Sequence, residues 1–529
     1  MKLTAGDVKA RGLPSSRKTA ALLAAIAATG VLAGLISTRA PVIATCAVIG
    51  GCALFVLIYH HLWVGIALFA VFNLVIPQAG PTWNLGLGTA MLGEGRGIHF
   101  NLQEIVMAMT FVAWVIKAAN GKAEWKTYSP MVIGIALYVA TSILASFIGI
   151  INGAHGLVLA FRFVRTVVFV YMFFPVINIV RTREDFHRLV VIMLVCFTLV
   201  AVFGLVQKGI GQTKTEWIAE HVLNRLGYPQ QVNYVAGESE GQAYRINSTF
   251  LHPNILGGYL VFALPFYVSL LSLYWRRRRT FIWFLLLLGL GANLAALFLT
   301  GSRAAWVAFG VIALAYGAFG FMDRRVWLAA ATVVMIVALV FVMLHPPDFV
   351  QKRFSGLSAK EAVEARTYSY RIAFDYFLER PLFGLGMGME GQRIIDNNIR
   401  QTWAAVENAY LTYLVSHGLV GLTAFLLLFA IYWGTLLRAR SASRHDPYIY
   451  FHAEAFILGM VGYAVANMFG AWILFAIPML TLFWFYLGMG SVLYNLYREE
   501  AATRPAPLFA VGGAASSLHG PGSLRGVTP

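Results

Sequence analysis

The sequence is built from a succession of apolar runs, each of about the length that crosses a lipid bilayer. A transmembrane helix needs about 20 predominantly apolar residues to cross roughly 30 Å of hydrocarbon. Runs of this kind recur between residues 19 and 494, with few charges inside them. Only 12% of the residues are charged, whereas soluble domains carry about 25%. The sequence therefore predicts an all-α integral membrane protein.

Counting these runs predicts about 14 transmembrane helices. The spans are expected at 19–37, 41–58, 60–77, 102–119, 129–151, 158–180, 187–208, 252–275, 281–299, 304–320, 326–344, 409–437, 451–469 and 471–494. The second and third runs are almost contiguous, and so are the last two. Each of these pairs fits a re-entrant hairpin as well as it fits two crossings.

The orientation follows from the distribution of Lys and Arg. More than half of the 40 basic residues fall on one side of the predicted bundle, mostly in short loops such as the run Arg276–Arg279. Cytoplasmic loops are enriched in Lys and Arg, so this side and both termini are expected in the cytoplasm. The net charge of +17 is thus a topology signal. No basic stripe is interleaved with aromatic residues, and nucleic-acid binding is not expected.

The predicted spans divide the chain into six regions. N-terminal transmembrane helices occupy 1–208, and further helices occupy 252–344 and 409–500. A medium periplasmic loop is expected at 209–251 and a large one at 345–408, with a helical pattern from about Lys360 to Arg380. The tail 501–529 is rich in Ala, Gly, Pro and Ser and is expected to be disordered and cytoplasmic. The three cysteines lie in predicted spans, and neither a disulfide framework nor a metal site is expected.

Four short polar motifs lie at the predicted external ends of spans. The first is 248–254 (Ser-Thr-Phe-Leu-His-Pro-Asn), and the second is 300–303 (Thr-Gly-Ser-Arg). The third joins Tyr-Ser-Tyr-Arg at 368–371 to Pro-Leu-Phe-Gly-Leu-Gly-Met-Gly at 381–388. The fourth is 407–411 (Glu-Asn-Ala-Tyr-Leu). Loops held by a rigid bundle are where binding and catalytic residues tend to lie.

In this order and at these positions, the four motifs resemble the superfamily of bacterial O-antigen ligases and O-antigen and exopolysaccharide polymerases. The resemblance covers about residues 245–425. It implies a glycosyltransferase that moves a glycan from an undecaprenyl-diphosphate carrier to an acceptor hydroxyl on the periplasmic face. It also implies that the reaction needs no cofactor and no metal.

Such a reaction needs cations for the leaving diphosphate, and Arg supplies bidentate donors that stay charged. Arg303 matches the Arg of the family's Gly-Ser-Arg motif, and Arg371 matches the family's loop Arg. Arg245, Arg162 and Arg165 are further candidates for binding the diphosphate. The alternatives are an interfacial snorkelling role for Arg303, a solvated position for Arg371, and snorkelling or a structural ion pair for Arg162 and Arg165.

The acceptor hydroxyl must lose a proton, and Glu407 is the candidate general base. The ligases resemble this stretch but carry His before the Asn, and here the position holds Glu. The alternative is a negative charge at a helix N-terminus. His252, Asn254 and Asn408 are expected to position substrate, with helix capping as the alternative for Asn254. His417 is interpreted as a packed polar residue.

The glycines at 384, 386 and 388 are interpreted as a flexible external turn, since no strand precedes them as in a phosphate-binding loop.

The departure at Glu407 favours a polymerase that joins carrier-linked oligosaccharide units into exopolysaccharide or O-antigen. A ligase that transfers the glycan to lipid A core is the alternative. A lipid-linked oligosaccharide flippase is disfavoured, because charge inside the predicted spans looks nearly confined to Arg162 and Arg165. The expected partners are the undecaprenyl-diphosphate-linked oligosaccharide, a glycan acceptor, the lipid bilayer and a chain-length regulator.

Overall fold

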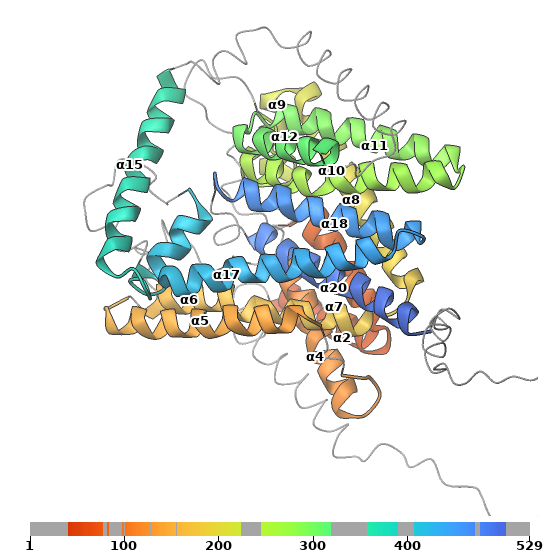
Figure 1. Cartoon of the computed structure of the whole chain (residues 1–529), viewed down its shortest axis with the longest axis horizontal. Coiled ribbons are helices and arrows are strands. Elements are labelled where there is room, and N and C mark those ends of the chain that lie inside the picture. The colour runs from red at the N-terminus through yellow and green to blue at the C-terminus, as the bar shows by residue number, and fades with distance from the viewer. Residues whose placement is uncertain are drawn as a thin grey trace, which may run out of the picture.

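The computed structural model describes a bundle of helices (Figure 1). The described residues are 41–77, 82–83, 98–99, 101–125, 129–154, 156–223, 245–318, 357–389, 407–470 and 477–503. Within them the fold is all-α, apart from one two-residue antiparallel pair, β1 (Thr82–Trp83) with β2 (Ile98–His99). The expected all-α fold is confirmed for this part of the chain.

The described helices have the following order along the chain. The first half holds α2 (Pro41–His60), α3 (Leu62–Val75), α4 (Leu102–Ala119), α5 (Met131–Ile151), α6 (Gly156–Val167), the 3₁₀ segment η2 (Val168–Met172), α7 (Phe173–Ile179), α8 (Arg183–Ile210), α9 (Gln212–Ile218) and the π-helical segment η3 (Ala219–Leu223). The second half holds α10 (Pro253–Arg276), α11 (Thr280–Leu299), α12 (Arg303–Ala318), α15 (Leu357–Glu379), α17 (Ala409–Ala442), α18 (Pro447–Ala466) and α20 (Ile477–Thr503).

Eight of the described helices are long and apolar enough to cross a membrane, namely α4, α5, α8, α10, α11, α17, α18 and α20. The chain is thus a multi-pass membrane protein. The predicted boundaries of α4 agree with the structure at both ends, where a capping box of Asn101 and Glu104 starts the helix. The expected span 158–180 is divided among α6, η2 and α7. The expected spans 19–37 and 326–344 lie outside the described residues.

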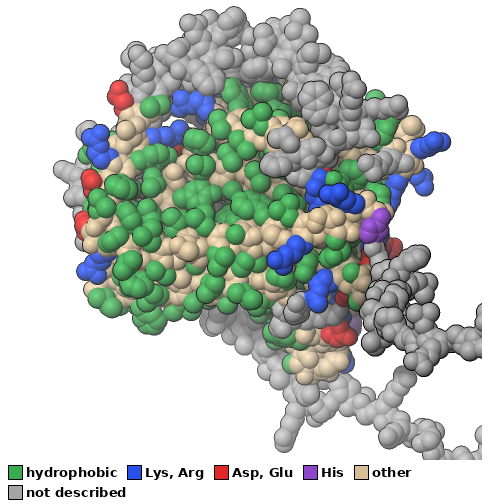
Figure 2. Space-filling model, in the orientation of Figure 1, with side chains coloured by type: hydrophobic (Ala, Val, Ile, Leu, Met, Phe, Trp, Pro, Cys, Tyr) green, Lys and Arg blue, Asp and Glu red, His purple; other side chains and the backbone are tan. Residues whose placement is uncertain are grey.

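Two classes of helix build the bundle. The centre is formed by α10, α18 and α20, whose apolar side chains are almost all buried. Peripheral helices such as α5, α8 and α11 leave large apolar side chains exposed, for example Phe147, Leu199 and Leu288. Figure 2 shows hydrophobic side chains spread over one face of the molecule. An apolar belt of this size on a soluble protein would aggregate, and on a membrane protein it faces lipid.

One helix runs in a different direction from the rest. The amphipathic helix α15 lies crosswise to α5 and α17 at one end of the bundle (Figure 1). The predicted helical run from Lys360 to Arg380 is confirmed, with a start three residues earlier. The end of the bundle beside α15 is called here the α15 end.

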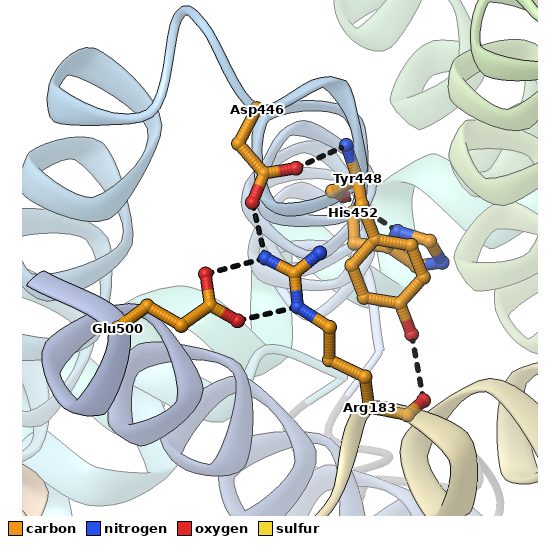
Figure 3. Close-up of polar contacts among 5 residues, drawn as sticks. All are labelled: Arg183, Asp446, Tyr448, His452 and Glu500. Carbon is orange, nitrogen blue, oxygen red and sulfur yellow. Dashed lines mark hydrogen bonds and ion pairs between the residues drawn. The ribbon is translucent and has the colours of Figure 1, made fainter. Parts of the chain in front are cut away.

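The opposite end of the bundle is closed by a cluster of ion pairs. The guanidinium of Arg183, at the start of α8, donates to Asp446 before α18 and to both carboxylate oxygens of Glu500 in α20 (Figure 3). The hydroxyl of Tyr448 donates to the Arg183 carbonyl at 3.1 Å. We call these residues the Arg183 cluster, and it ties three helices together.

The expectation that charge within the spans is nearly confined to Arg162 and Arg165 is wrong. Glu454 in α18 is fully buried, and its Oε2 lies 3.3 Å from Nη2 of Arg440 in α17. The Ser269 hydroxyl donates to Oε1 of the same carboxylate at 3.4 Å. An unpaired charge at this depth would cost several kcal/mol, and the pairing with Arg440 removes most of that cost.

Candidate functional site

The first polar group at the α15 end joins two of the sequence motifs through Arg245. The buried guanidinium donates from Nε to the carbonyl of Thr300 at 2.7 Å, and from Nη2 to Oδ1 of Asn254 at 2.7 Å. The first motif is thereby fixed against the second, although about fifty residues separate them. Arg245 is thus a buried crosslink between the starts of α10 and α12.

The residues around Arg245 penetrate the bundle. Residues 245–250 are all buried. The Gln207 side chain holds the backbone of Ser248 on both sides, accepting from its N–H and donating to its carbonyl. Ser248 adopts φ 52°, a conformation that few residues other than glycine adopt. This end of the predicted periplasmic loop is therefore part of the packed core.

The cap of α10 is His252. Its Nδ1 accepts from the backbone N–H of Asn254 at 3.0 Å, and Pro253 fills the first helical position. The alternative role of Asn254 as the helix cap is wrong, since its side chain accepts from Arg245 instead.

Arg303 begins α12 directly beside this group. Gly257 in α10 faces Ser302 and Ala305 so closely that a Cβ at Gly257 would lie 2.8 Å from the Ala305 Cβ. This contact packs the first turn of α12 on the first turn of α10, which carries His252 and Asn254. Arg303 is half-buried there, within the same end of the bundle as Arg245.

The second polar group centres on Glu407, which precedes α17. Nε of Arg366 in α15 donates to Oε2 of Glu407 at 2.6 Å, and Nη2 of the same guanidinium also contacts Oε2. The Tyr370 hydroxyl donates to the Glu407 carbonyl at 3.0 Å. Burial raises the pKa of Tyr370, so the phenol stays protonated as a donor. We call Glu407, Arg366 and Tyr370 the Glu407 group.

The two oxygens of the Glu407 carboxylate have different surroundings. Oε2 receives both bonds from Arg366, and Oε1 accepts no hydrogen bond from the part of the chain that the structure describes. The side chain is 45% exposed. A carboxylate held through one oxygen keeps its second oxygen as a possible acceptor for a hydroxyl proton.

Asn408 is the N-cap of α17. Its Oδ1 accepts from the backbone N–H groups of Tyr410 and Leu411, at 3.0 and 3.1 Å. The helix-end role weighed for Glu407 therefore belongs to its neighbour. Glu407 remains outside the helix, with its carboxylate turned to Arg366.

The expected flexible turn at the glycines 384, 386 and 388 is wrong, because residues 384–388 are buried between α5 and α17. The N–H of Leu385 donates to the Val415 carbonyl at 2.8 Å, and the N–H of Met387 donates to the Ala145 carbonyl at 2.8 Å. The helix α17 is itself interrupted at Gly418, whose φ is 66°. A Cβ at Gly418 would lie within 2.6 Å of the Gly384 nitrogen. Glycine is required at this contact by both conformation and space.

The remaining predicted residues are more dispersed. Arg371 is exposed on the side of α15 away from Arg366, without a hydrogen bond or ion pair to the residues described here. Arg162 and Arg165 lie in α6, but their side chains are outside the described part. His417 is buried, and its Nδ1 lies 2.7 Å from the Ser416 hydroxyl, in keeping with a packed polar residue.

The two polar groups lie at the same end of the bundle. The C-terminal end of α18 lies between them. Its Asn467 carbonyl accepts from the Ala409 N–H at 3.0 Å, and its Ala464 carbonyl accepts from the Tyr410 hydroxyl at 2.8 Å. On its other side, Tyr463 packs against Phe262 of α10 with ring centroids 4.6 Å apart. The end of α18 thus contacts both the start of α17, next to the Glu407 group, and the helix α10, whose first turn carries Asn254.

A comparison with protein families adds to this geometry. Residues 288–426 match the family model described as O-antigen ligase. Over this region the chain is similar to the O-antigen ligases. The matched region contains Arg303, Arg371, Glu407 and Asn408, whereas Arg245 and the start of α10 precede it. Among the curated proteins, none matches the chain.

Arg366 is the site residue that sequence reasoning missed. It lies on the face of α15 that packs on α17, four residues before Tyr370 and seven before the buried Ala373. That i, i+4, i+7 spacing is the one signal for it in the sequence. Arg371, five residues on, falls on another face of the helix.

Proposed function

We propose that this protein transfers a glycan from a polyprenyl-diphosphate carrier, undecaprenyl diphosphate, to the hydroxyl of an acceptor glycan. The observation that carries the proposal is the Glu407 carboxylate, held through Oε2 by Arg366, while Oε1 accepts no hydrogen bond from the described residues. It lies at the end of the bundle that also carries Arg245 and Arg303. The superfamily match supports the same class of reaction.

In the proposed step the acceptor oxygen attacks the anomeric carbon of the carrier-linked sugar. The bond from that carbon to the diphosphate oxygen breaks, and the bonding electrons leave with the diphosphate. The hydroxyl proton passes to Oε1 of Glu407. Arg303 and Arg371 neutralise the charge on the departing diphosphate, and Arg fits this role because its planar fork binds phosphate through two donors.

The acceptor decides between two activities. The Glu at position 407, where ligases of this superfamily carry His, supports a polymerase that extends exopolysaccharide or O-antigen. The description of the matched family supports the second candidate, a ligase whose acceptor is lipid A core. An assay of the purified protein with carrier-linked repeat units, in the presence and absence of lipid A core, distinguishes the two activities. A polymerase produces a longer carrier-linked chain, and a ligase produces a glycosylated lipid A.

We place the proposed reaction on the periplasmic side of a bacterial inner membrane. The chain is expected to cross this membrane about 14 times, with both termini in the cytoplasm. Single cysteines at Asp375 in α15 and at Ser441 in α17, both exposed, test this arrangement in a background without native cysteines. An impermeant maleimide added to intact spheroplasts should label Asp375→Cys and leave Ser441→Cys unlabelled until the membrane is opened. Labelling of both from the same side would contradict the topology.

The test of the chemistry is Glu407→Gln, which keeps the shape and the contact with Arg366 but cannot accept a proton. Loss of a general base should lower the transfer rate by roughly 10²–10⁴-fold. The measurement is the initial rate of product formation from purified carrier-linked units in proteoliposomes. Glu407→His should retain partial activity, because imidazole fills this position in the ligases.

The matched control is Glu364→Gln, which removes an exposed carboxylate from the same neighbourhood and should leave the rate unchanged. Near-normal transfer by Glu407→Gln would show that Glu407 serves only to hold α15 against α17.

A further inference from the structure

The helix α15 carries an apolar stripe on its exposed side. Val363, Phe374 and Leu378 recur at helical spacing along this side, with exposures of 53%, 49% and 58%. Leu382 and Phe383 extend the stripe beyond the helix, with exposures of 57% and 47%. We call these five residues the outer stripe.

The other edge of the exposed side is acidic. Glu364, Asp375 and Glu379 are exposed along it. The third side of the helix packs on the bundle through Ala373 and Tyr376. An exposed surface divided lengthwise into an apolar stripe and a charged edge is typical of a helix that lies in a membrane surface.

The outer stripe joins the lipid-facing surface of a transmembrane helix. The N–H of Leu419 donates to the Pro381 carbonyl at 2.9 Å, and the N–H of Val420 donates to the Leu382 carbonyl at 3.1 Å. Leu419 and Val420 are exposed in the apolar segment of α17. In Figure 2 the hydrophobic surface over α5 and α17 continues to the edge of the molecule where α15 lies.

The orientation of α15 agrees with a position along the surface of a membrane. A helix crosswise to the transmembrane helices lies roughly parallel to the membrane plane (Figure 1). Its C-terminal end leads into residues 384–388, which are buried between α5 and α17. The stripe therefore begins at the lipid-facing belt and runs along the end of the bundle.

We propose that α15 is an interfacial helix whose outer stripe is buried in the phospholipid leaflet at the α15 end. The occupant is the boundary between headgroups and acyl chains, which accommodates apolar side chains on one edge of a helix and charges on the other. Arg371 lies between the stripe and the acidic edge, at the depth of lipid phosphates. The inference depends on the bundle being in a membrane and is independent of the reaction catalysed.

The test uses single spin labels on the protein in phospholipid bilayers. After replacement of the three native cysteines, labels are placed by Phe374→Cys and Leu378→Cys in the stripe and by Glu364→Cys and Asp375→Cys on the acidic edge. The accessibility of each label to oxygen, which partitions into lipid, is compared with its accessibility to a water-soluble nickel chelate. Val420→Cys provides the lipid-exposed reference.

The stripe labels should give an oxygen-to-nickel accessibility ratio several-fold higher than the edge labels, and close to that of Val420→Cys. Equal ratios at stripe and edge would place α15 in water and overturn the proposal. Exclusion of both reagents from the stripe would overturn it too, because another protein chain would then cover that side.

Discussion

Both ends of the bundle contain arginine–carboxylate pairs, but the hydrogen-bond partners of the carboxylate oxygens differ between the two ends. In the Arg183 cluster, Glu500 uses both oxygens on Arg183, and Asp446 divides its oxygens between Arg183 and the Tyr448 N–H (Figure 3). In the Glu407 group, Oε2 takes both bonds from Arg366. A carboxylate whose oxygens are all engaged holds helices together, whereas one with an oxygen outside these hydrogen bonds can also exchange a proton.

The Arg440–Glu454 and Arg366–Glu407 pairs also differ in how deeply they are buried. Glu454 is fully buried beside Arg440, whereas the Glu407 side chain is 45% exposed. Removing one partner of a buried pair leaves an uncompensated charge in an apolar medium. Removing one partner of an exposed pair costs little, because water replaces it. The same substitution should therefore cost much more stability at the Arg440–Glu454 pair than at the Arg366–Glu407 pair.

The largest expected effect on stability is that of Arg440→Met. It strands Glu454 in the core and should lower the free energy of unfolding by about 3–5 kcal/mol. The matched change Arg366→Met should lower it by less than about 1 kcal/mol and should instead reduce transfer, because Glu407 loses its anchor. Thermal unfolding in detergent, with transfer rates measured alongside, checks both. Equal destabilisation by the two variants would remove the distinction between the ends.

A second effect concerns the arginines assigned to the diphosphate. Arg303→Lys and Arg371→Lys keep the charge but lose the bidentate fork. Hydrogen bonds to charged groups are worth about 1.5–3 kcal/mol, so each variant should lose roughly tenfold to a hundredfold in transfer rate, nearly as much as the Ala variant. Initial rates in proteoliposomes measure this loss. Full activity in both Lys variants would make these arginines interfacial residues without a part in the reaction.

The smallest expected effect comes from Gly418. An alanine there must adopt a left-handed conformation and collide with the packed segment near Gly384, at a cost of about 1–3 kcal/mol. Gly434 lies in the same helix with open space around it, and Gly434→Ala should be neutral or stabilising by up to about 1 kcal/mol. Unfolding temperatures of the two variants provide the measurement. If Gly418→Ala unfolds like Gly434→Ala, the interruption of α17 is not needed for the fold.

Much of the fold could be predicted from the sequence, because a bilayer restricts the chain to apolar helices of a set length. The boundaries of α4 and the helix at 357–379 follow from such local patterns. The path of residues 245–250 through the core could not be predicted, because a short polar stretch reads as a loop until Gln207 and Thr300 are known to satisfy its polar groups.

The candidate site was predictable only in outline. The motifs identified the segments that gather at the α15 end, but the partner of Glu407 is Arg366, which no motif contains. Likewise, Glu454 can be located in the predicted span 451–469 from the sequence, but its pairing with Arg440 depends on how α17 and α18 pack. Pairings between helices are set by tertiary contacts, which local sequence patterns do not encode.

The non-helical residue Gly418 divides α17 into two segments, and Glu407 lies at the far end of the first segment. Glu407 lies about ten residues before the interruption, which corresponds to an arm of roughly 15 Å in helical geometry. A rotation of about 10° at that one residue would sweep the carboxylate through about 2–3 Å, enough to separate it from a hydroxyl in hydrogen-bond contact. Hydrogen bonds from the Ala409 N–H and the Tyr410 hydroxyl to carbonyls at the end of α18 fix this segment close to Glu407. The position of Glu407 is thereby set by two backbone attachments on a neighbouring helix.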